Sequence, residues 1–229
     1  MANELPFSAS RVKLNRARKF IAELESEQAA YAKEDPLSAT AIANPEKLSV
    51  SVSWKGIGLV PGAIVGDAVH NMRTALDLMS SELARMNGKN DKDVYFPFST
   101  TKDNLQDAIV KKGFNKTGAD SVALLVKLAP YRGGNDALRA LHDLDIEDKH
   151  TALIPSGIDM DFAIDVEVTV QEIGASMPIP IGSNNVHYSF PPNSFFSGRR
   201  IIETLKELVQ LVDGVIEEFS RMVALRTSK

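Results

Sequence analysis

The sequence predicts an α+β fold that is mostly α, a bundle of four to six helices carrying a small antiparallel sheet. Long segments repeat apolar residues at helical spacing, and short segments alternate apolar with polar residues. The 229 residues show no internal repeat and no low-complexity segment. We therefore expect a single domain over 1–229, with helices within 8–150 and 199–226 and strands from 47–56 and 151–190.

Helical periodicity runs through most of the chain. Apolar residues recur at spacings of three and four, and Gly88 follows the longest such stretch as a stop signal. Asn135 is placed to cap a later helix that enters the segment Leu141–His150. We expect the other helices at Ser8–Ala32, Pro61–Asn87, Thr101–Lys112, Thr117–Leu128 and Arg199–Leu225.

The first and last of these helices have unusual faces. Ser8–Ala32 carries basic residues before acidic ones, which opposes the helix macrodipole, so we expect tertiary packing to hold this helix. The last helix has a continuous apolar seam, which suits either a homodimer contact or packing onto its own bundle. The seam consists of Ile201, Ile202, Leu205, Leu208, Leu211, Val212, Val215 and Phe219.

Strict alternation of apolar and polar residues predicts strands. IDVEVTVQEI at 164–173 alternates, and so does KLSVSVSWKG at 47–56. The second segment is typical of a half-buried strand. Its apolar face would consist of Leu48, Val50, Val52 and Trp54. Asp35–Lys47, just before it, has two prolines and small residues, so we expect a loop there.

Composition narrows the class of protein. The chain has no cysteine, which excludes disulfides, thiolate metal sites and cysteine nucleophiles. A net charge of −4 argues against a broad, non-specific nucleic-acid binder but is compatible with a local basic cleft. No apolar run approaches the length of a membrane span, and the N-terminus lacks the apolar core of a secretion signal. We therefore expect a cytoplasmic protein.

Polar residues gather on one face of the longest predicted helix. At about 100° per residue, Asp67, His70 and Asp77 lie opposite the apolar stripe, with Thr74 among them and Arg73 on the flank. Spacings of three and four make His70, Arg73 and Asp77 neighbours on the helix surface. The alternative is an ordinary solvated face with weak local ion pairs.

The segment LHDLDIEDKH, Leu141–His150, fills a helical turn with carboxylates. Helical geometry places Asp145 and Asp148 on the continuation of an apolar seam, while His142 and Lys149 lie on its flank. Carboxylates on a buried seam are costly unless they are paired or hydrogen-bonded. Two alternatives stay open. In the first, Asp145 and Asp148 accept hydrogen bonds from Arg73, Lys149 or a histidine of a facing helix, which makes a polar knot between the helices. In the second, the helix ends near Asp145 and continues as a solvated loop.

If the two helices face each other, their imidazoles, cations and carboxylates converge. Two imidazoles with a cation support metal-free phosphodiester cleavage, in which one ring accepts a proton from a 2′-hydroxyl and the other protonates the leaving oxygen. We expect catalytic roles for His70, His142 and Arg73. The expected ligand-binding residues are Asp77, Asp148, Lys149 and His150.

A metal site is the alternative chemistry for the same residues. His70, His142 and the aspartates could hold a divalent ion with an open position for water. His142 and Asp143 also spell the HD dipeptide of metal phosphohydrolases. The site that we favour from the sequence contains no metal ligand and no cofactor.

Two motifs carry a resemblance to a known family. GDAVHNMRTALDLM contains HN-x-R-x-A-L-D, and LHDLDIEDKH contains LH-x-L-x-x-x-DKH. With both motifs, residues 11–151 resemble a family of uncharacterised bacterial and phage-borne proteins of this length. The resemblance implies a shared site and adds Asn71 to its ligand-binding residues. The matching positions are His70, Asn71, Arg73, Ala75, Leu76, Asp77, Leu141, His142, Leu144, Asp148, Lys149 and His150.

A more distant resemblance concerns the bundle as a whole. A helical bundle with Arg, His and Asn residues is similar to the HEPN superfamily, whose members are often metal-independent ribonucleases of defence and toxin systems. The motif of that superfamily places an arginine four to six residues before a histidine. Here Arg139 precedes His142 by three residues, and Arg73 follows His70.

The first hypothesis is a helical protein that binds RNA or a nucleotide phosphate and could cleave it without a metal ion. The second is a non-enzymatic module that binds or sequesters a ligand, in the context of phage–host conflict. The third is a metal-dependent phosphohydrolase. For partners we expect a nucleotide or RNA ligand and no membrane, and a homodimer stays open.

Overall fold

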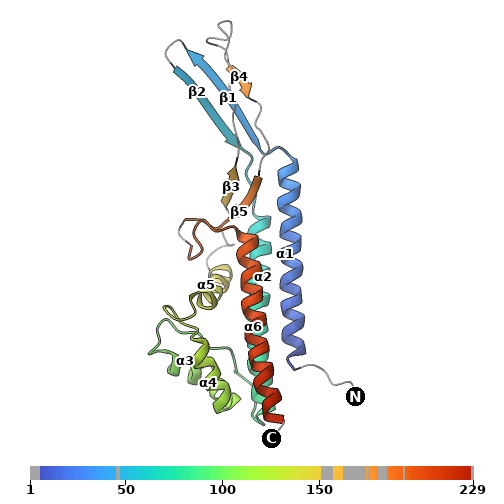
Figure 1. Cartoon of the computed structure of the whole chain (residues 1–229), viewed down its shortest axis with the longest axis vertical. Coiled ribbons are helices and arrows are strands. Elements are labelled where there is room, and N and C mark those ends of the chain that lie inside the picture. Colours follow the sequence, from blue (N-terminus) through green and yellow to red (C-terminus); the bar gives the residue numbers. More distant parts are fainter. Residues whose placement is uncertain are drawn as a thin grey trace.

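The protein has the predicted α+β, mostly α fold (Figure 1). The structure is a computed structural model that describes residues 6–44, 47–150, 157–161, 174, 176–179, 185–192 and 194–227. Within these residues it contains six α-helices, a three-stranded sheet and a two-stranded sheet. No helix in the described ranges is long and apolar enough to cross a membrane.

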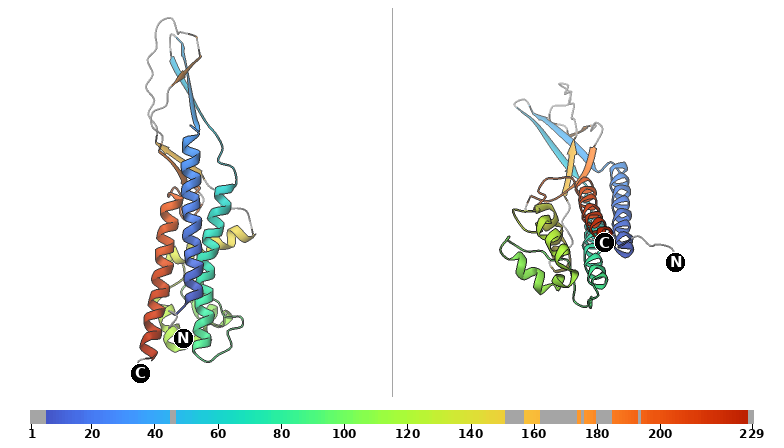
Figure 2. Two further views of the ribbon diagram at one scale, coloured as in Figure 1. Left: turned by 90° about the vertical axis from the view of Figure 1, so that its right-hand side faces the viewer. Right: turned by 60° about the horizontal axis from the view of Figure 1, so that its bottom comes forward.

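Three long helices form the main body of the molecule: α1 (Ser8–Lys33), α2 (Val60–Met86) and α6 (Ile201–Thr227). They run alongside one another, and the two views in Figure 2 show α1 packed against both α2 and α6. Apolar side chains from all three helices meet in one core, with Leu14 and Met72 fully buried. The sequence predicted these three helices to within a few residues at each end.

The apolar seam of α6 lies inside the core of its own chain. Leu205 and Val212 are fully buried there, and Phe219 packs edge-on against Phe114. Of the two alternatives for this seam, packing onto its own bundle is therefore the one that the structure shows. The same packing holds α1 in place although its charge order opposes the helix dipole.

The shorter helices pack on one side of the long ones (Figure 1). They are α3 (Leu105–Lys111), the 3₁₀ helix η1 (Phe114–Thr117), α4 (Ala119–Leu128) and α5 (Asp136–His150). The α5 prediction is confirmed at its start, where Asn135 Oδ1 accepts the backbone N–H of Leu138 at 3.0 Å.

α3 begins four residues later than the sequence predicted. The residues before it form local side-chain bonds instead of a helical turn: Ser99 donates to the Thr101 carbonyl at 2.7 Å, and the Asn104 amide donates to the Thr100 hydroxyl at 3.2 Å. Such bonds compete with helix formation, which explains the shift.

The predicted loop at 35–47 is wrong, because most of it is a strand. β1 (Leu37–Asn44) pairs along its whole length with β2 (Lys47–Trp54), and β4 (Ser176–Ile179) adds to its other side in the order β2-β1-β4. The two prolines flank β1 at positions 36 and 45 and do not interrupt it. Within β1, buried Ala39 and Ala41 alternate with exposed residues.

β2 is confirmed as a strand, but its apolar face is not half-buried as expected. Trp54 is 64% exposed, Leu48 47% and Val50 42%, and only Val52 joins the small cluster around Ala41. The reason is the position of the sheet, which projects beyond the ends of the long helices (Figure 1). Alternation showed which residues share a face, but not what covers that face.

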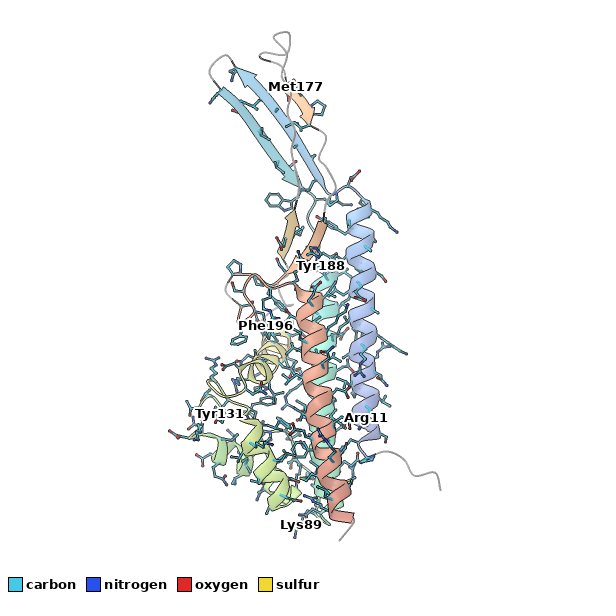
Figure 3. All side chains as sticks on the ribbon, in the orientation of Figure 1. Arg11, Lys89, Tyr131, Met177, Tyr188 and Phe196 are labelled. Carbon is cyan, nitrogen blue, oxygen red and sulfur yellow. The ribbon has the colours of Figure 1, made fainter. Side chains whose placement is uncertain are left out.

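A second sheet lies where the helices end. β3 (Gly157–Asp161) pairs with β5 (Asn185–Ser189), and the Tyr188 backbone N–H donates to Gln28 Oε1 of α1 at 2.9 Å. In Figure 3, Tyr188 lies at the junction, between Met177 on the projecting sheet and Arg11 at the far end of α1. Both strands fall in the predicted range 151–190, whereas the alternating segment 164–173 lies outside the described residues.

Candidate functional site

α2 and α5 meet, as the polar-knot alternative required. α5 continues as a helix to His150, so the second alternative, a loop after Asp145, is wrong. Close packing at the crossing depends on Gly66 of α2, because a Cβ atom there would overlap the carboxylate of Asp148. A carboxylate from α5 thus lies directly against the backbone of α2, where a larger residue would displace it.

His70 is the exposed imidazole of this crossing. Its side chain is 45% exposed, and its Nδ1 lies 3.1 Å from Oδ1 of Asp145, whose side chain is only 6% exposed. A carboxylate can only accept, so Nδ1 is the nitrogen that donates this hydrogen bond. The Thr74 hydroxyl lies 3.4 Å from that Nε2. His70 therefore has a ring that Asp145 orients, on a side chain that is nearly half exposed.

Asp145 also binds the cation of the next turn. Lys149 Nζ lies 2.7 Å from Asp145 Oδ2, so the two carboxylate oxygens are divided between His70 and Lys149. The buried carboxylate is thereby paired on both sides, which offsets the cost of removing it from water. His70, Asp145 and Lys149 form one unit, which we call the His70 cluster.

Arg73 is held inside the structure. It is buried, with one terminal nitrogen on Asp77 and the other donating to the Phe96 carbonyl at 3.1 Å. Its guanidinium also lies over the ring of Phe98, 4.7 Å from the centroid. Asp77 in turn accepts the Phe96 backbone N–H at 2.9 Å. Arg73 and Asp77 therefore fasten the segment 96–98 to α2.

His142 belongs to the same inner group. Its ring stacks on Phe98 at 4.6 Å between centroids with an angle of 7°, and its Nδ1 accepts the Arg73 Nε–H at 3.4 Å. Burial, followed by the charges of Arg73 and Arg139, lowers the pKa of His142 from 6.5 to about 4. The ring is therefore neutral near pH 7. We call Arg73, Asp77, Phe98 and His142 the Arg73 knot.

Asp148 has an environment that favours its protonated form. Burial is the largest cause of its raised pKa, and the charges of Asp67 and Asp145 add to it. His70 and Lys149 act in the opposite direction. An imidazole and a carboxyl group with a raised pKa thus share the outer side of the α2–α5 crossing, a combination often found where protons are transferred.

The structure divides the sequence-predicted site into separate places. His70, Asp148 and Lys149 lie together at the outer side of the crossing, whereas His142, Arg73 and Asp77 lie in the knot. Asn71 is buried, donates to the Asp67 carbonyl at 2.8 Å, and lines a different pocket that faces α1. His150 is the last residue of α5, and its side chain lies outside the described part of the structure.

The HD dipeptide does not form a metal centre with the other candidates. Asp143 points to Arg139 and Arg132, at 2.5 and 3.2 Å, and not toward Asp145. Among the side chains that the structure describes, no group of three or more His, Asp or Glu residues is placed to hold a metal ion.

Sequence reasoning found one of the two residues that organise the site and missed the other. The sequence predicted that Asp145 accepts hydrogen bonds from Arg73, Lys149 or a facing histidine, and Asp145 binds Lys149 and His70. Its position on the apolar seam was the signal for this prediction. Phe98, which stacks on both Arg73 and His142, lies in an irregular segment whose sequence gives no such signal.

Comparison with family models, with curated proteins and with solved structures gave no match to this chain.

Proposed function

We propose that the chain binds RNA or a nucleotide at the outer side of the α2–α5 crossing and cleaves a phosphodiester there, with His70 as the proton-accepting group. The observation that carries this proposal is the His70 cluster: an exposed imidazole whose Nδ1 is fixed by a buried carboxylate. The same arrangement orients the catalytic imidazole in hydrolases of several unrelated folds.

In the proposed reaction, His70 Nε2 takes the proton of a ribose 2′-hydroxyl. The 2′-oxygen then forms a bond to phosphorus, and the bond from phosphorus to the 5′-oxygen breaks. The departing 5′-oxygen takes a proton from the Asp148 carboxyl group. The products are a 2′,3′-cyclic phosphate and a 5′-hydroxyl, so every proton and bond is accounted for without a metal ion.

The group that donates a proton to the leaving oxygen in this scheme differs from the one that the sequence suggested. His142 was the expected proton donor, but its stacked, neutral ring in the knot suits a structural role better. Asp148 replaces it, since its raised pKa favours the protonated form that a general acid needs. Lys149, whose side chain is 40% exposed, is the cation closest to the developing negative charge in this proposal.

Replacing Asp145 tests the proposal. Asp145→Asn removes the charge that fixes the Nδ1–H form of His70, and we expect turnover of short single-stranded RNA to fall by about 100-fold or more. The products are resolved by denaturing electrophoresis and checked for cyclic phosphate, with and without EDTA. The matched control is Asp143→Asn on the same helix, whose carboxylate binds Arg132 and Arg139 and should leave turnover unchanged.

Two outcomes would contradict this function. If the wild-type protein cleaves neither RNA nor nucleotides, the proposed reaction is wrong. If EDTA abolishes cleavage, the metal-dependent phosphohydrolase becomes the better description.

A non-enzymatic binding module is the second candidate function. It is favoured by the Arg73 knot, which places the arginine and one of the two expected imidazoles in packing contacts. In that case the wild-type protein would bind a nucleotide or RNA without turnover, and a nucleotide retained through purification would be visible by native mass spectrometry.

A further inference from the structure

A basic pocket lies between α1 and α2, on the other side of Asn71 from the His70 cluster. Its volume is about 570 Å³, within the range of pockets that hold small ligands. Three cations of α1 line it together with Phe20 and Asn71. The full lining is Val12, Lys13, Asn15, Arg16, Lys19, Phe20 and Asn71.

The three cations of this pocket differ from their neighbours on α1. Arg11 and Arg18 are each paired with a carboxylate of α6, both at 2.7 Å. By contrast, no ion pair joins Lys13, Arg16 or Lys19 to a carboxylate within the described ranges. The guanidinium of Arg16 instead lies over the Phe20 ring, 4.7 Å from its centroid. Positive charge from three side chains is therefore gathered at one pocket.

The three cations lie in the N-terminal half of α1, whose first turn has no acidic residue. A pocket lined by charges of one sign raises the local concentration of ions of the opposite sign, here of anions. The chain has a net charge of −4, which makes this local excess of positive charge more distinctive.

The pocket and the His70 cluster are joined by α2. Asn71 follows His70 directly, so the two side chains leave the helix about 100° apart at the same level. Figure 2 shows α2 between α1 and α5. Near His70, Lys149 is accompanied by the carboxyl groups of Asp67, Asp145 and Asp148, so the further phosphate groups of a bound ligand need positive charge from another surface. The cations of α1 can supply what the His70 side lacks.

We propose that this pocket is a phosphate-binding subsite, in which Lys13, Arg16 and Lys19 bind phosphate groups of a nucleotide or of single-stranded RNA. Phe20 gives the subsite an aromatic surface for a base, in the manner of proteins that bind single strands. The nature of the ligand rests on the proposed function, whereas the anion binding rests on the pocket itself.

The test measures binding separately from cleavage. A fluorescein-labelled short single-stranded RNA is titrated by anisotropy against full-length protein carrying His70→Ala, so that no substrate is consumed. We expect the triple change Lys13→Ala, Arg16→Ala and Lys19→Ala in this background to weaken binding at least about tenfold. The loss of three phosphate contacts should also reduce the slope of the logarithm of the binding constant against the logarithm of salt concentration by about 2 in magnitude.

A second triple variant controls for net charge. Lys89, Lys102 and Lys111 are exposed and lie far along the chain from the pocket, and their replacement by Ala removes the same charge. This control should bind as tightly as its parent. Thermal unfolding separates binding from folding, because removing the three cations from α1 should leave the melting temperature unchanged or slightly higher.

Competition identifies the source of the phosphate. Displacement of the labelled RNA by ATP supports a nucleotide-sized ligand, and displacement by unlabelled RNA alone supports a single strand. The subsite would be overturned if the pocket variant binds as tightly as its parent. It would also be overturned if both triple variants bind equally weakly. Either result leaves the cleavage proposal intact. Specific binding without wild-type turnover would support the subsite and overturn the cleavage.

Discussion

At the scale of single residues, the two imidazoles of the α2–α5 crossing differ because their surroundings differ. His70 has one nitrogen on buried Asp145 and the other 3.4 Å from the Thr74 hydroxyl, and nearly half of its side chain is exposed. His142 has its ring face on Phe98 and one nitrogen on Arg73. Sequence spacing made these rings equivalent candidates, and only the tertiary contacts distinguish them.

The lowered pKa of His142 makes a prediction about stability. The unfolded chain binds a proton at this histidine near pH 6.5, whereas the folded protein does so only near pH 4. Between these values the unfolded state binds more protons, so the contribution of His142 to stability is complete above about pH 6.5 and is lost as pH falls toward about 4.

Urea unfolding of the wild type and of His142→Gln at a series of pH values measures this contribution. We expect the free energy of unfolding of the wild type to fall more steeply between pH 6.5 and pH 4. The raised pKa of Asp148 makes its own contribution to stability grow as the pH falls, which is opposite to the effect of His142. Asp148 is present in both proteins, so the difference between their free energies of unfolding isolates the effect of His142. Parallel pH profiles would show that the ring is not held in its neutral form by the fold.

At the scale of elements, α2 connects every part of the proposed site. Its side toward α5 carries His70 and Arg73, and its side toward α1 carries Asn71. The helix could be predicted from sequence because its apolar stripe is long and regular. Which of its polar residues meet α5, and which meet the loop that contains Phe98, could not be predicted, because irregular segments have no periodicity to read.

Gly66 offers a test of the α2–α5 packing. Gly66→Ala adds a methyl group where the Asp148 carboxylate now lies, and the flexible end of Asp148 has to move away. The gain in helix propensity is about 1 kcal/mol, which should roughly offset the disturbed contact. We expect a nearly unchanged melting temperature with reduced turnover, because the Asp148 carboxyl group is displaced although the residue itself is unchanged.

The matched control for this change is Gly214→Ala in α6, where an added Cβ has nothing within 4 Å. It should affect neither turnover nor the α2–α5 contacts. Full activity in Gly66→Ala would argue that the position of Asp148 does not matter for the reaction.

The sheets show where element prediction fails. β1 was expected to be a loop because of its flanking prolines and small residues, yet its alternation of buried Ala with Ser and Thr pairs residue by residue with β2. A strand built from small residues lacks the apolar contrast on which sequence patterns depend. Its partner β2 has that contrast, and was predicted for that reason.

At the scale of the whole molecule, the helices concentrate the candidate sites in one region. The core of α1, α2 and α6 fixes the pocket between α1 and α2, and α5 packs beside α2 at about half the length of the bundle (Figure 1). The projecting sheet lies at one end, away from both places. Composition and periodicity predicted the class of fold, because they report on how much of the chain is helical. They carry no information on the direction in which a sheet projects.

We propose that His70 is the reactive imidazole of the α2–α5 crossing and that His142 is a packing residue. The most direct measurement is RNA turnover by His70→Ala, made alongside its melting temperature and compared with His142→Ala. We expect His70→Ala to lose turnover and to melt only a few degrees below the wild type, since Lys149 still pairs with buried Asp145 and 1 kcal/mol shifts a domain of this size by about 2–4 °C. We expect His142→Ala to melt clearly lower than His70→Ala. Wild-type turnover in His70→Ala would contradict the claim.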